Sequence, residues 1–176
     1  TPLSTALSEW MLDYHRDYGK QVIDAYFGGI TDLNADGRTA VLVTPLVESG
    51  TAAFVWSGDF FSRTQCPASN EMELIRFSLS VITAMSGSSP NYQALATLVH
   101  EMKHVSSLYQ SVVRGQYQPL CVEEGTAELA GELSSRLAWE AAGGPAVNAM
   151  IKRSDKVVTK ESYGVLLRLA RTIGYL

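Results

Sequence analysis

Apolar residues recur at three- and four-residue steps along two long stretches of the chain. The first stretch, residues 3 to about 27, predicts one long amphipathic helix or two short ones. The second runs from residue 90 to about 113, with Ser89 placed to cap it and Pro90 suited to its first position. Its apolar stripe consists of Leu95, Leu98, Met102, Val105 and Leu108. We expect both helices to bury one face against the rest of the chain.

Two apolar runs rich in β-branched residues lie between these helices, at residues 39–46 and 51–56. Only a short polar segment separates them, which predicts neighbouring antiparallel strands of a small sheet. Further along, Asn70 with Glu73 three residues later is a capping-box pattern, and it predicts a helix that extends through Ile82. The expected fold class is therefore α+β, mostly helical with a small sheet.

The segment from Asp32 to Gly37 begins like a calcium-binding loop, with Asp32, Asn34 and Asp36 at alternate positions. The twelfth position of such a loop should be a glutamate, but Val43 occupies it here. The missing ligand favours a polar turn that leads into the following strand.

The second helix contains the pattern H-E-x-x-H, in the residues His100, Glu101 and His104. Residues four apart lie one above the other on a helix, so the two imidazoles can bind one metal ion. Glu101 is placed to accept a proton from a metal-bound water. Zinc is the expected metal, because imidazole suits it and the chemistry requires no redox change.

A catalytic zinc site has three protein ligands and one open position. A third histidine six residues beyond the second is one solution, but Gln110 stands there. The alternative is a glutamate from the next helix, and both Glu123 and Glu124 are candidates. We favour Glu124, because Glu128 lies four residues further on the same helical face and can accept the free ring N–H of one histidine. Glu123 has no such partner and is expected at a solvated helix start.

The metal motif and the later segment 124–128 (EGTAE) resemble the gluzincin pattern of thermolysin-like and aminopeptidase N-like metallopeptidases. His104 and Glu124 are one residue further apart than in the aminopeptidases. Segments 56–61 (WSGDFF) and 69–73 (SNEME) are also similar to the hyicolysin-like bacterial metallopeptidases, so that the resemblance covers about residues 39–163. It implies a zincin-like fold, zinc-dependent endopeptidase activity on a peptide or protein substrate, and secretion.

Peptidases of this kind need a donor for the oxyanion that forms when water attacks the peptide carbonyl. Related families use a downstream tyrosine or histidine, and no histidine follows His104. Tyr163 is therefore the first candidate, while Tyr109 and Tyr117 remain possible. A tyrosine that only packs against a helix start is the alternative interpretation of Tyr163.

Length, charge and cysteine content bear on the number of domains, the partners and a disulfide bridge. The 176 residues suit a single domain, residues 1–176, either a mature chain or a domain excised from a longer precursor. The net charge of −4 gives no reason to expect nucleic acid or an anionic membrane as partner, and no apolar stretch is long enough to span a bilayer. Cys66 and Cys121 can form one bridge in a secreted protein or remain two thiols.

A second function is compatible with the same sequence. The metal could be structural, in which case the chain would be a non-catalytic zincin-like binding or regulatory module. Glu101 argues against this, because structural zinc sites need no general base and usually have four protein ligands.

Overall fold

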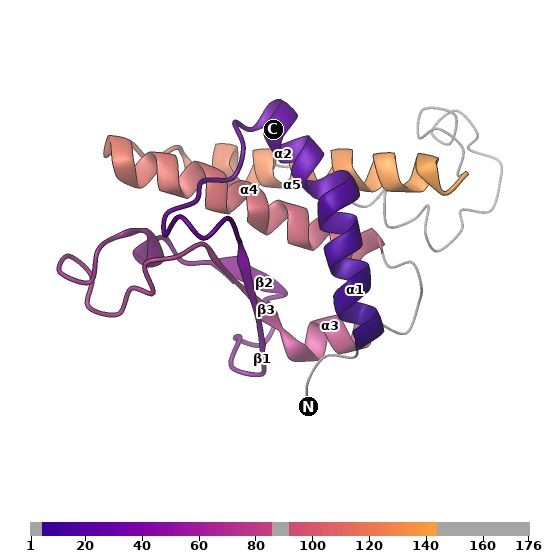
Figure 1. The fold of residues 1–176 in the computed structure, drawn as a ribbon, viewed down its shortest axis with the longest axis horizontal. Coiled ribbons are helices and arrows are strands. Elements are labelled where there is room, and N and C mark those ends of the chain that lie inside the picture. The colour runs from indigo at the N-terminus through magenta and orange to yellow at the C-terminus, as the bar shows by residue number, and fades with distance from the viewer. Residues whose placement is uncertain (1–4, 86–91, 144–176) are drawn as a thin grey trace.

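Helices surround one face of a three-stranded sheet in the computed structural model, which describes residues 5–85 and 92–143 (Figure 1). The helical elements in chain order are α1 (Thr5–Tyr14), the π-helical segment η1 (His15–Gly19), α2 (Lys20–Tyr26), the 3₁₀ turn η2 (Ser57–Phe60), α3 (Leu79–Met85), α4 (Tyr92–Arg114) and α5 (Leu120–Ala141). The strands are β1 (Ala40–Thr44), β2 (Ala53–Val55) and β3 (Leu74–Ser78). The expected α+β class is confirmed.

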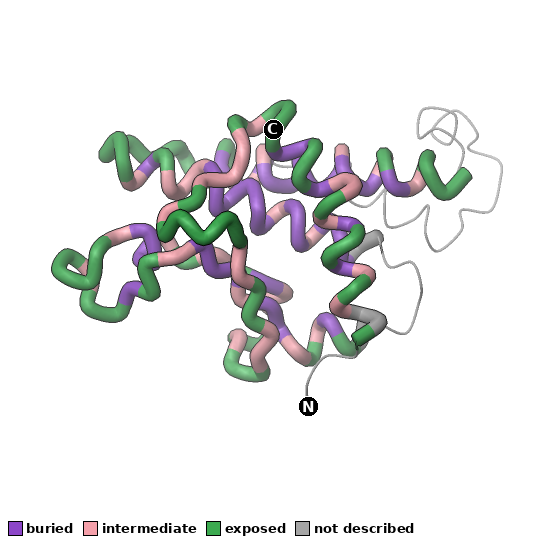
Figure 2. Tube along the Cα trace, in the orientation of Figure 1, coloured by how far each residue is buried: buried purple, intermediate pink, exposed green. Residues whose placement is uncertain are grey.

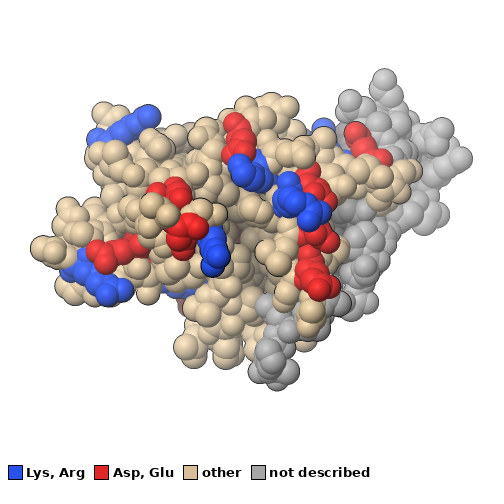
Figure 3. Space-filling view, viewed as in Figure 1, with Lys and Arg blue, Asp and Glu red and all other residues tan. Residues whose placement is uncertain are grey.

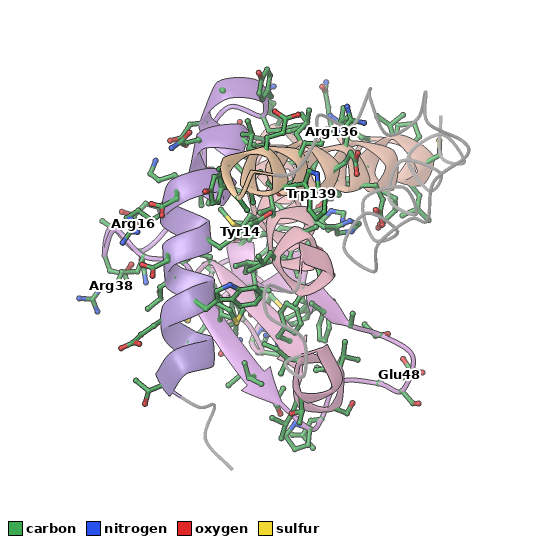
Figure 4. The ribbon with its side chains drawn as sticks, turned by 90° about the vertical axis from the view of Figure 1, so that its right-hand side faces the viewer. Tyr14, Arg16, Arg38, Glu48, Arg136 and Trp139 are labelled. Carbon is green, nitrogen blue, oxygen red and sulfur yellow. The ribbon has the colours of Figure 1, made fainter. Side chains whose placement is uncertain are left out.

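The first helix is continuous from α1 through η1 to α2, which is the first of the two alternatives that the apolar stripe left open. The π-helical segment ends at Gly19, which packs directly on α4: a Cβ atom there would lie 3.0 Å from Val99 Cγ2. One turn earlier, the buried Tyr14 hydroxyl donates a hydrogen bond of 3.0 Å to Ser134 Oγ of α5 (Figure 4 shows Tyr14 on the inner side of its helix). The first helix therefore holds α4 and α5 together.

The sheet has the order β1-β3-β2, so the predicted pairing of the two apolar runs is wrong. β3 lies between them, parallel to β1 and antiparallel to β2. Ile75 and Phe77 of β3 are fully buried on the same face of the sheet. Parallel pairing of β1 with β3 requires a long connection, and β2 is part of that connection.

The predicted helix from residue 70 to 82 is also wrong over most of its length, because residues 74–78 form β3 and α3 begins only at Leu79. The capping-box residues have other partners. Asn70 donates from its backbone and side-chain nitrogens to Asp59 Oδ1, at 3.0 and 2.7 Å, and Glu73 accepts from the backbone N–H of Leu33. A short apolar run buried in a central strand has the same composition as a buried helix, so hydrophobic pattern alone does not separate them.

Helix α4 forms the centre of the core. Its residues Leu98, Val99, Met102 and Val105 are almost completely buried, and the sheet and the first helix pack against it. Figure 2 shows burial concentrated along α4, α5 and β3, with exposure along the outer side of α1 and the loops. Within residues 5–85 and 92–143, no helix has the length and apolar character needed to cross a bilayer.

Candidate metal centre

The predicted ligands from two helices converge on one point. His100 and His104 lie on α4 and Glu124 lies in the first turns of α5, and their ligand atoms are all within 4.8 Å of one another. The two Nε2 atoms are 3.0 Å apart. Glu124 Oε2 lies 3.3 Å from His100 Nε2, and Oε1 lies 3.6 Å from His104 Nε2.

These separations fit a tetrahedral zinc site. Ligands about 2.0–2.1 Å from a tetrahedral zinc ion lie roughly 3.3–3.4 Å from each other. The three observed edges, 3.0, 3.3 and 3.6 Å, bracket that value, and the donor set of two imidazoles and one carboxylate is one that catalytic zinc sites use. Among the residues that the structure describes, this is the group that meets the geometric requirement for a metal ion.

The second nitrogen of each imidazole faces a different carboxylate. His100 Nδ1 lies 3.6 Å from Glu128 Oε1, on the same side of α5 as Glu124. His104 Nδ1 makes a hydrogen bond of 2.7 Å with Glu123 Oε1. Carboxylates in these positions fix the ring orientation and tautomer, so that both Nε2 atoms are available to a metal.

Glu123 is not at a solvated helix start, and that expectation is wrong. Its side chain is buried, because α5 begins at Leu120 and packs along α4. Besides His104, it accepts from Lys103 Nζ at 2.7 Å and from the Ser107 hydroxyl. Burial would raise the pKa of Glu123, but hydrogen bonds from His104, Lys103 and Ser107 lower it to about 2.

Lys103 and Ser107 were not identified from the sequence, although their spacing could have indicated that they act together. They are four residues apart and therefore share one face of α4, next to the face of the histidines. Lys103 Nζ also donates to the backbone carbonyl of Glu123 at 3.2 Å. Burial lowers the pKa of Lys103, and the contact with Glu123 opposes that effect. The pair joins α4 to α5 beneath the metal ligands.

Glu101 is buried beside the two imidazoles, with only 5% of its surface exposed. Its Oε2 atom has no hydrogen-bond partner among the described residues. Burial raises the pKa of Glu101, and the charges of His100 and His104 oppose that change. A buried carboxylate with a free oxygen and a raised pKa has the properties of a general base.

The contacts with His100 and then with His104 lower the pKa of Glu124. Burial would lower the pKa of His104, but Glu123 and Glu124 together raise it to about 9. Negative charge therefore surrounds the two imidazoles, which favours a cation at this position.

Of the tyrosine candidates, the structure describes Tyr109 and Tyr117, and neither is among the residues grouped at the centre. Tyr163 lies outside the described residues. Tyr109 packs on Phe60 in an edge-to-face arrangement, with ring centroids 6.1 Å apart, and Tyr117 is exposed. Cys66 and Cys121 are both free thiols, so the structure contains no bridge between them.

The other side of α4 faces an apolar cavity of about 550 Å³, between α1 and the sheet. Leu98 and Met102 line it, each two residues from a histidine and therefore on the opposite side of the helix. Acidic and basic side chains are interspersed on the molecular face of Figure 3, with no large area of one sign. Neither feature belongs to the metal centre.

Searches against protein-family models, characterised proteins and solved structures found no match for this chain. The geometry and chemistry of the centre are therefore the basis for assigning a function.

Proposed function

We propose that this protein is a zinc-dependent peptidase with a zincin-like fold, in which a water activated at the metal hydrolyses a peptide bond. The observation that carries the proposal is the convergence of His100, His104 and Glu124, with the free oxygen of Glu101 buried beside them. Three protein ligands leave a fourth position for water, as in catalytic zinc sites.

His100, His104 and Glu124 would hold the zinc ion, which would supply a water of lowered pKa and a Lewis acid for the scissile carbonyl. Glu101 Oε2 would accept the proton of the attacking water and pass it to the leaving amine. Burial supports this role, because it raises the pKa of Glu101 and so makes the carboxylate a stronger base. Glu128 and Glu123 hold the imidazole rings in position through their Nδ1 atoms.

The edge of the sheet provides a place for an extended substrate. β2 is an edge strand and packs against α4, the helix that carries both histidines, so a peptide added alongside β2 would lie next to that helix. Main-chain hydrogen bonds to an edge strand are a general way to hold an extended chain. We assign Tyr163 as the oxyanion donor and secretion as the destination, both on the resemblance described above.

Metal analysis and hydrolysis of unfolded casein test the proposal together. We expect one zinc ion per chain, loss of hydrolysis with a chelator, and recovery when zinc is returned. Glu101→Gln should retain zinc and lose hydrolysis by at least about 100-fold. Glu48→Gln is the matched control and should have wild-type activity, because Glu48 is exposed in the loop after β1 and Glu101 lies on α4.

Two results would overturn the assignment. Full activity in Glu101→Gln would remove the general base from the mechanism. One bound zinc with no hydrolysis of any peptide would instead favour the non-catalytic binding module.

A further inference from the structure

In the acidic loop before β1, backbone N–H groups donate hydrogen bonds to carboxylate oxygens of the same loop. Asp32 accepts from the backbone N–H groups of Asp36 and Gly37, at 3.0 and 2.9 Å, through its two carboxylate oxygens. Asp36 Oδ1 accepts from the N–H of Arg38 at 2.8 Å. The tight path needs positive φ at Ala35 and Gly37. The loop therefore holds Asp32, Asn34 and Asp36 on one small turn.

A third acidic side chain reaches this turn from the start of the central strand. Glu73, immediately before β3, is only 1% exposed, and its Oε1 accepts from the N–H of Leu33 inside the turn. Its Oε2 has no hydrogen-bond partner among the described residues. The backbone of Glu73 is held beside the start of β1, because the N–H of Ala40 donates to the carbonyl of Glu73 at 2.8 Å.

No basic side chain neutralises this group of carboxylates within residues 5–85 and 92–143. The ion pairs of the described residues include none with Asp32, Asp36 or Glu73. Burial raises the pKa of Glu73, and the charges of Asp32 and Asp36 raise it further. A buried carboxylate that faces two others without a cation is costly in free energy.

We propose that the loop from Asp32 to Gly37 and Glu73 form a calcium site. The sequence lacks the glutamate at the twelfth position of a calcium loop, and Glu73, which precedes β3, supplies a carboxylate from a distant position in the chain. Asp32, Asn34 and Asp36 offer the alternating side-chain oxygens of such loops, and Glu73 offers the carboxylate that closes the site. The donors are all oxygens, which suits calcium and not zinc.

The ion would draw the loop inward. Only the histidine centre has three ligand atoms already within 4.8 Å of one another among the described residues, so the acidic oxygens need to move closer to coordinate calcium. The loop precedes β1 and Glu73 precedes β3, so a calcium ion bound by both would link the first residues of these two parallel strands. The expected result of binding is a more stable sheet.

Calorimetric titration of the full chain with CaCl₂, after passage over a chelating resin, tests the site. We expect one calcium ion per chain, with a dissociation constant between about 10⁻⁶ and 10⁻³ M and much weaker binding of magnesium. Calcium at 100 times that constant should raise the Tm by about 5 °C or more.

Variants connect the binding to these residues. Asp36→Asn and Glu73→Gln should each weaken calcium binding at least about tenfold, because the charge of the ligands sets the affinity. Asp36 is exposed, so its variant keeps the test valid even if Glu73→Gln disturbs folding. Glu48→Gln is the matched control, because Figure 4 places Glu48 on the far side of the molecule from Arg38, which follows the loop.

Absence of calcium binding to the wild-type chain at millimolar concentration would overturn the proposal. Unchanged affinity in Asp36→Asn would overturn it as well. Both results are independent of zinc binding and of peptide hydrolysis.

Discussion

The two helices of the metal centre and the sheet with its acidic loop both gather carboxylates, but they do so by different routes. In the helices, His100 and His104 meet because they are four residues apart on α4, and a single neighbouring helix supplies Glu124. In the sheet, Asp32 and Glu73 come together across 41 residues of chain, because β3 is inserted between β1 and β2. Helical spacing is visible in a sequence, whereas strand order is not.

The same difference appears in the charges that surround each cluster. The acidic side chains at the histidine centre have partners: Glu123 has Lys103 and His104, and Glu124 has both imidazoles. Glu73 has a backbone N–H and a free oxygen. The carboxylates of the helical cluster are therefore paired with cationic side chains, while no such partner faces Glu73 among the described residues.

The largest effect that separates the two regions is expected at Glu123. Glu123→Gln removes the negative charge that faces the buried Lys103, and loss of one partner of a buried ion pair costs about 3–5 kcal/mol. Urea unfolding of the metal-free chain measures this change. Glu124→Gln is the control, because it removes a partly exposed carboxylate and should change the free energy of unfolding of the metal-free chain much less. Equal destabilisation by both variants would contradict the distinct roles of these neighbours.

The candidate metal centre was the more predictable part of the molecule. The motif on α4 and the choice of Glu124 over Glu123 follow from spacing of three and four residues along a helix, and the structure brings those side chains together. The burial of Glu123 was not predictable from its own helix alone, because it depends on how α5 packs on α4. Its partners, Lys103 and Ser107, lie on a different helix.

The sheet was less predictable for a reason that concerns β3. The strand has only five residues, which are buried or nearly buried on both faces. Its alternation of apolar and polar residues covers four positions and leads directly into the apolar helix α3, so it is too short to identify a strand. Arg76 pairs with the buried Asp59 at 2.7 Å. When β3 is taken for a helix, β1 and β2 are expected to pair with each other and Glu73 is expected to cap that helix. The wrong assignment of β3 therefore also explains the wrong strand pairing and the wrong role of Glu73.

The second expected effect tests the strand directly. Ile75 is completely buried beneath the sheet, and Ile75→Ala should lower the free energy of unfolding by about 2–5 kcal/mol. Leu42→Ala on the exposed side of β1 is the control and should cost much less, because Leu42 is 47% exposed. Zinc affinity should be the same in both variants, since the sheet supplies none of the metal ligands. If Ile75→Ala left the free energy of unfolding unchanged, the central position of β3 would be refuted.

The third effect concerns zinc affinity and sharpens the distinction between Glu123 and Glu124. Glu124→Gln removes a ligand and should weaken zinc binding by more than about 100-fold, because loss of a residue that only orients a ligand already costs 10–100-fold. Glu123→Gln should weaken zinc binding by only about 10–100-fold. Competition with a zinc-binding dye measures both constants. If Glu123→Gln weakened zinc binding more than Glu124→Gln, the third ligand would have to be reassigned.

The smallest effect is expected at Glu128. Its Oε1 lies 3.6 Å from His100 Nδ1, whereas Glu123 Oε1 lies 2.7 Å from His104 Nδ1, so Glu128 restrains its imidazole less strongly. Glu128→Gln keeps the volume of the side chain and an acceptor oxygen but removes the charge. We therefore expect about a tenfold loss of zinc affinity, at the low end of the range for residues that orient a metal ligand. A loss as large as that of Glu124→Gln would mean that Glu128 itself binds the metal, and that the centre has no open position for water.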